Sequence, residues 1–101
     1  MNRKKFIEHL KIGDMLFTKN ELKTCLIEQM LDYIEKRIAL YELIELSETI
    51  RRRYLSQASN DVINVVNKLH EIHEDLHDPT KKQLTEEEII FKVDDFLVSL
   101  T

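Results

Sequence analysis

Residues 85–100 read TEEEIIFKVDDFLVSL, and this stretch decides the fold class. Its apolar residues recur three and four positions apart, which places them on one face of an α-helix. Thr85 and Glu88 have the spacing of a capping box, in which each side chain bonds to the other residue's backbone amide. The stretch therefore predicts an amphipathic helix that begins after Thr85. Its apolar face consists of Ile89, Ile90, Val93, Phe96, Leu97 and Leu100.

Helical spacing continues from this stretch towards the N-terminus. A helix is expected from about Ser59, and it ends before Pro79 because proline cannot continue a helix. A second capping box, Thr18 with Glu21, predicts the start of another helix. Gly13 follows a short opening helix as its C-terminal cap. The chain of 101 residues is thus expected to form one all-α domain, a bundle of four helices, or five if the second one breaks.

The helix that begins after Thr18, the second in chain order, is unusual, because no stop signal precedes the polar residues that begin at Ser56. Without a break it is one long central helix of about 37 residues, or roughly 55 Å. A compact chain of this length has a diameter of only about 35 Å. Two solutions are open. Either the helix breaks or bends between Ser47 and Thr49, or a second copy of the chain covers the protruding part.

Residues 38–46 of that helix read IALYELIEL, with seven of nine positions apolar. A helix that is apolar nearly all round is buried on most sides. Either the other helices of the chain supply the cover, or another polypeptide does. The second alternative predicts a homodimer or a protein partner, held by aromatic and branched aliphatic side chains. These interface residues are Tyr33, Leu40, Tyr41, Leu43 and Ile44.

The basic run Arg51, Arg52 and Arg53 lies near the expected end of the same helix. Its simplest role is to complement the helix dipole, because cations are favourable at a helix C-terminus. With Lys68, the run also suggests phosphate contacts in a nucleic-acid-associated factor. Recognition of an acidic partner is the third alternative.

The histidines His73 and His77 with Glu74 spell HExxH, and His70 adds a third imidazole. One helical turn separates His73 from His77, so both rings can approach one zinc ion. Pro79 ends the helix soon afterwards, and so short a chain leaves little protein for a substrate cleft. We therefore expect no peptidase. The remaining alternatives are a noncatalytic metal site and ordinary, partly buried histidines.

Composition limits the remaining function classes. The formal net charge is −4, so there is no overall cationic field to attract nucleic acid or anionic lipid. No apolar run approaches the roughly 20 residues that span a bilayer, which predicts a cytoplasmic protein. The single Cys25 lies in an apolar helical pattern and is expected to be a buried thiol. Ten lysines against five arginines, and eleven isoleucines against two alanines, suggest a bacterial or phage source.

Catalytic and cofactor motifs are not evident. A chain with one glycine has no glycine-rich loop to hold phosphates, so no cofactor is expected. The sequence predicts a small non-enzymatic protein that acts through protein–protein interaction as a regulator, inhibitor or accessory factor. The nucleic-acid and metal-binding functions are the alternatives.

Overall fold

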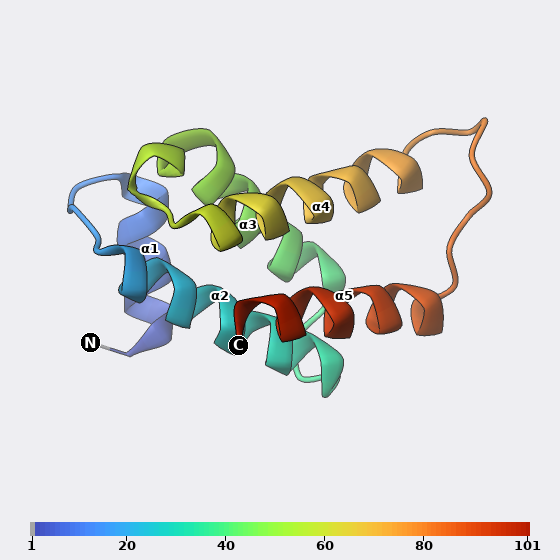
Figure 1. Ribbon diagram of the computed structural model, residues 1–101, viewed down its shortest axis with the longest axis horizontal. Coiled ribbons are helices and arrows are strands. Elements are labelled where there is room, and N and C mark those ends of the chain that lie inside the picture. The colour runs from blue at the N-terminus through green and yellow to red at the C-terminus, as the bar shows by residue number, and fades with distance from the viewer. Residues whose placement is uncertain (1) are drawn as a thin grey trace.

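The computed structural model describes residues 2–101, and these residues form an all-α globule (Figure 1). The predicted fold class is confirmed, with five α-helices and no strand among the described residues. A short 3₁₀ turn, Leu55–Gln57, links the helix that ends at Arg53 to the helix that begins at Asn60. The helices are α1 (Arg3–Ile12), α2 (Lys19–Ile34), α3 (Leu40–Arg53), α4 (Asn60–Leu76) and α5 (Glu86–Leu100).

The predicted helix ends are confirmed where the sequence carried a cap. At the start of α2, the Thr18 amide donates to the Glu21 carboxylate over 2.9 Å, and the Glu21 amide donates to the Thr18 hydroxyl over 3.1 Å. Thr85 and Glu88 make the same pair of bonds at the start of α5. Gly13 ends α1 with a φ of 76°, a left-handed conformation that glycine adopts without strain.

The long central helix is a wrong prediction, because the chain turns between Ile34 and Leu40. The proposed break at Ser47–Thr49 is also wrong, since those residues lie inside α3. Lys36 adopts a φ of 62°, and its amide donates to the Tyr33 carbonyl over 3.0 Å. The next amide, that of Arg37, donates to the Asp32 carbonyl over 2.8 Å. These two bonds around a left-handed residue form a Schellman motif, which ends α2.

This motif lacks the residues by which it is usually detected. Its left-handed position is most often glycine, but here it is Lys36. An apolar contact usually joins the outer residues, whereas here an ion pair joins them, with Arg37 Nε donating to Asp32 Oδ1 over 2.9 Å. The Arg3 guanidinium of α1 also bonds to Asp32. Burial by itself raises the pKa of the Asp32 carboxyl, but the bonds from Arg37 and Arg3 outweigh burial and lower it.

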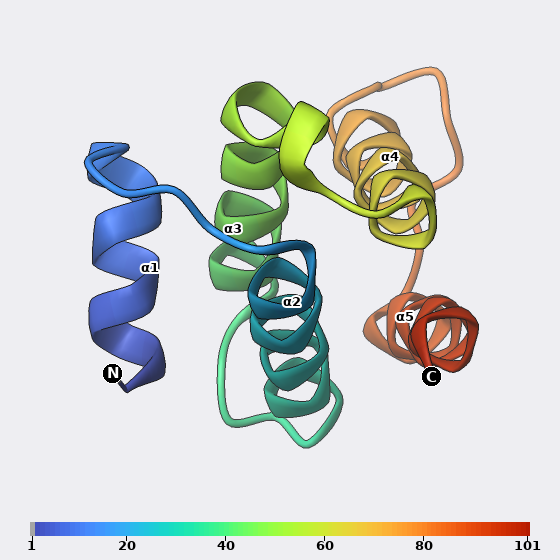
Figure 2. The same cartoon turned by 60° about the vertical axis from the view of Figure 1, so that its left-hand side comes forward.

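The turn folds α3 back against its neighbours. Figure 2 shows α1, α2 and α3 upright, with α4 and α5 nearly end-on. Three helices, α1, α2 and α4, pack on α3, while α5 packs on α2 and α4. The longest dimension of the molecule is 39 Å, well below the roughly 55 Å expected of an unbroken helix.

Three of the predicted interface residues are buried inside the chain itself, because α3 packs against three other helices. Leu43 is fully buried, and Tyr33 and Ile44 are also buried within the single chain. The cover that the apolar run requires comes from α1, α2 and α4, and therefore does not call for a second polypeptide at these positions.

Two further predictions concern burial. Cys25 is buried in the core, as expected, and burial raises the pKa of its thiol to about 12. Within residues 2–101, no helix combines the length and the hydropathy required to cross a bilayer.

Candidate docking groove on α3

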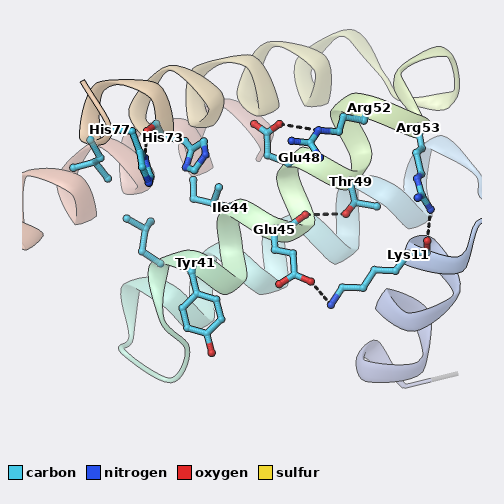
Figure 3. A pocket seen from close by; sticks show the side chains of 12 residues that line it. Lys11, Tyr41, Ile44, Glu45, Glu48, Thr49, Arg52, Arg53, His73 and His77 are labelled. Atoms are coloured by element: carbon cyan, nitrogen blue, oxygen red, sulfur yellow. Dashed lines mark hydrogen bonds and ion pairs between the residues drawn. The ribbon is translucent and has the colours of Figure 1, made fainter. Parts of the chain in front are cut away.

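A groove with a volume of about 610 Å³ runs along the surface of α3, between α1 and the C-terminal end of α4 (Figure 3). We call it the α3 groove. The pattern of α3 explains its origin, because Leu43, Leu46 and Ile50 point into the core and leave another side of the helix at the surface. Its lining consists of Lys11, Leu40, Tyr41, Ile44, Glu45, Glu48, Thr49, Arg52, Arg53, His73, Leu76 and His77.

The apolar part of the lining comes from Leu40, Tyr41, Ile44 and Leu76. Tyr41 is 68% exposed at the groove, so its ring remains available to a ligand. Of the five predicted interface residues, Leu40, Tyr41 and Ile44 line the groove, whereas Tyr33 and Leu43 do not. The two that do not line the groove are buried, Tyr33 in α2 and Leu43 on the inner side of α3.

The basic part of the lining joins two helices. The Lys11 ammonium of α1 forms an ion pair with the Glu45 carboxylate. The Arg53 guanidinium donates to the Lys11 backbone carbonyl, a neutral acceptor that leaves the arginine charge uncompensated. The Arg52 side chain is 73% exposed. The lining therefore carries three permanent cations against two carboxylates, in a chain whose formal net charge is −4.

The structure divides the residues that the nucleic-acid hypothesis grouped together. Arg52 and Arg53 line the groove, while Arg51 lies beside Glu48, with 3.7 Å between Nη1 and Oε2. Lys68 belongs to a different surface, since its Nζ lies 5.5 Å from the centre of the Phe96 ring on α5. These cations do not form a single phosphate-binding face.

Glu48 is a buried carboxylate in the wall of the groove, with 9% of its side chain exposed. Its Oε1 lies 2.5 Å from His70 Nδ1, which links α3 to α4. Its Oε2 is within ion-pair distance of Arg51 and of Arg52, whose Nε lies 3.6 Å away, but it has no hydrogen-bond donor among the described residues. Glu48 therefore holds Arg51 and Arg52 of α3 and an imidazole of α4 around one buried charge.

The three histidines are not arranged as metal ligands. The second ring nitrogen of His70 lies 2.6 Å from Glu74 Oε1, so carboxylates occupy both of its nitrogens. The rings of His73 and His77 lie 4.5 Å apart, and His77 Nδ1 donates to the His73 carbonyl over 2.8 Å. Within residues 2–101, no group of three or more potential ligands is placed to hold a metal ion. Of the groups that the HExxH spacing suggested for zinc, the Glu74 carboxylate and His77 Nδ1 are engaged in other contacts within α4.

Sequence reasoning missed Lys11, Glu45, Glu48 and Thr49 as parts of this site. Glu48 carried a weak signal, because it follows the buried Ile44 by one helical turn and so falls on an apolar stripe. The participation of Lys11 carried no signal, since it depends on how α1 packs on α3.

The groove offers an apolar floor, an exposed aromatic ring and an excess of positive charge. Comparisons with family models, with curated proteins and with solved structures give no match for this chain.

Proposed function

We propose that this chain is a small non-enzymatic protein that binds another protein through the α3 groove. The observation that carries the proposal is Tyr41, an aromatic side chain that is 68% exposed beside an apolar floor. A ring in this position gains a large apolar contact when a partner covers it. The role proposed for such a binder is that of a cytoplasmic regulator, inhibitor or accessory factor.

The residue types of the groove support a protein as the ligand. Tyrosine and arginine contribute most to binding at the centres of protein interfaces, and both occur here, as Tyr41 and Arg52. Nε of Arg52 faces the buried Glu48, while the exposed remainder of the guanidinium can reach a partner's carboxylate. Its existing ion pair with Glu48 fixes one side of the guanidinium and reduces the freedom lost on binding.

Site-specific crosslinking tests the proposal. A photoreactive amino acid in place of Tyr41 should crosslink a protein in extracts of the source cells. The same group at Glu71, an exposed position on α4 outside the groove lining, is the matched control. The Tyr41 product should be lost when Arg52→Glu is added. Equal products at both positions, or a Tyr41 product that does not depend on Arg52, would contradict the proposal.

Nucleic-acid association is the second candidate, and the exposed guanidinium of Arg52 is the observation that favours it. Phosphate contacts make affinity fall steeply with salt. This function predicts a mobility shift of DNA or RNA at low salt that Arg52→Ala weakens. Unchanged migration at low salt would eliminate it.

A further inference from the structure

The outer face of α5 is a second exposed apolar surface. Phe91 is 77% exposed and Val98 is 66% exposed, and the two lie seven positions apart on one side of the helix. The other side of α5 buries Ile89, Val93 and Leu97. Figure 2 shows α5 at the edge of the molecule, where α2 and α4 leave its outer side uncovered.

Acidic residues flank this apolar pair. Glu87, Asp94 and Asp95 are exposed, and with Phe91 and Val98 they fall within roughly 100° of arc at 3.6 residues per turn. We call these five residues the acidic ridge. It combines two apolar anchors with three negative charges.

The α3 groove has the complementary properties. Its floor of Leu40, Tyr41 and Ile44 can receive an apolar anchor, and Lys11, Arg52 and Arg53 lie toward one end of that floor, where they outnumber the two carboxylates of the lining (Figure 3). We propose that the acidic ridge of one copy of this chain docks in the α3 groove of a second copy. The inference rests on the proposed function and names its partner. Phe91 covers the floor beside Tyr41, and Asp94 and Asp95, one turn farther along α5, point toward Lys11 and the basic end of the groove.

The contact has to form between copies. Within one chain α5 is fixed against α2 and α4, while the groove lies on α3 between α1 and α4. Two molecules of net charge −4 repel each other overall, so local pairing of opposite charges determines which faces meet. Because those charges are exposed, added salt should weaken the association.

Paired variants test the inference in solution. Arg52→Glu alters the groove and leaves the ridge intact, whereas Asp94→Lys with Asp95→Lys alters the ridge and leaves the groove intact. All three residues are exposed, so both proteins should keep their helical circular dichroism. In sedimentation of a dilution series, wild type should associate. For each variant alone, the concentration below which the assembly dissociates should be about tenfold or more higher than for wild type. An equimolar mixture should regain mass, because an intact ridge then meets an intact groove.

The control is Glu71→Lys, which changes a charge outside both surfaces and should leave the association unchanged. A monomeric wild type, variants that associate as wild type does, or a mixture that remains monomeric would each overturn the inference. If wild type is monomeric and Tyr41 still crosslinks a different protein in the Arg52-dependent manner, the second copy is excluded as the partner and the proposed function stands. If wild type is monomeric and Tyr41 crosslinks no protein in the Arg52-dependent manner, the proposed function is contradicted as well.

Discussion

The inner side of α3 is buried and the outer side of α5 is exposed, although both carry apolar side chains. The run IALYELIEL contains the densest apolar stretch noted in the chain, yet Leu43 and Ile44 within it are buried. Phe91 and Val98 share one face of α5 with Glu87, Asp94 and Asp95, and both are largely exposed. The comparison shows that the number of neighbouring helices determines exposure, because α3 has three such neighbours and α5 has two. Tyr41 of the same run is nevertheless 68% exposed, so an apolar run indicates a helix with many neighbours but does not decide which of its side chains are covered.

The largest test of this comparison is Leu43→Glu against Phe91→Glu. A carboxylate at the fully buried Leu43 should cost at least about 4 kcal/mol, a large part of the 5–15 kcal/mol that stabilises a typical domain. Circular dichroism should show a mostly unfolded protein at 25 °C. Phe91→Glu, on an exposed face, should change stability by less than about 0.5 kcal/mol. A folded Leu43→Glu protein that has merely dissociated would show that another copy, and not the chain itself, covers α3.

A smaller loss of stability is expected from Asp32→Asn, which weakens the contacts of α2 with α1 and with the turn before α3. Asp32 holds both Arg3 of α1 and Arg37 of the turn, and loss of such charged hydrogen bonds should cost about 1.5 kcal/mol at pH 7. Because its pKa is lowered by folding, its contribution is present above the ordinary value of 3.8 and is lost as the pH falls through the folded value.

Thermal unfolding of wild type and Asp32→Asn should therefore differ at pH 7 and converge as the pH falls below about 4. Asp14→Asn, at an exposed carboxylate paired with His9, is the control with little effect at pH 7. A constant difference between Asp32→Asn and wild type across this pH range would mean that Asp32 does not act through its charge.

Next in size is Tyr54→Phe, which loosens α1 from α3. The buried Tyr54 hydroxyl donates to the Leu10 carbonyl over 3.0 Å, and its loss should cost about 1 kcal/mol. For a domain of this size that corresponds to a fall in Tm of about 4 to 8 °C. Tyr41→Phe removes the same atom from an exposed ring and should leave Tm unchanged. An equal change in Tm for the two substitutions would argue that the bond between Tyr54 and α1 does not help to hold α1 against α3.

The smallest expected effect is a gain. Lys36→Gly removes the steric cost of a left-handed lysine but increases the freedom of the unfolded chain, for a net stabilisation of about 0.5 kcal/mol. The midpoint of urea unfolding should rise. Lys36→Ala keeps a Cβ and should not stabilise the protein. A rise with alanine equal to that with glycine would show that backbone strain at the turn is not the cause.

Most of the fold could be predicted from local chemistry. Thr18, Thr85 and Gly13 each have one strong reason to end or begin a helix, and the structure places helix ends there. The end of α2 could not be found in this way. Its signal is an ion pair between Asp32 and Arg37 around a strained lysine, and neither charge differs in sequence from the many solvated charges nearby.

The candidate site was predictable only in fragments. Tyr41, Arg52 and His73 each belonged to a different hypothesis drawn from sequence spacing, yet all three line one groove. Their proximity depends on the approach of α4 to α3, which helical periodicity does not encode. Lys11 enters through the packing of α1 for the same reason.

The buried thiol of Cys25 has a practical consequence for all of these experiments. With its pKa near 12, it is almost entirely protonated at neutral pH and sheltered from alkylating reagents while the protein is folded. The 101 residues contain no other cysteine. A cysteine introduced at Glu71, an exposed position outside both proposed surfaces, would thus be the one reactive position for a maleimide dye, and energy transfer between differently labelled copies could measure their separation without removing Cys25.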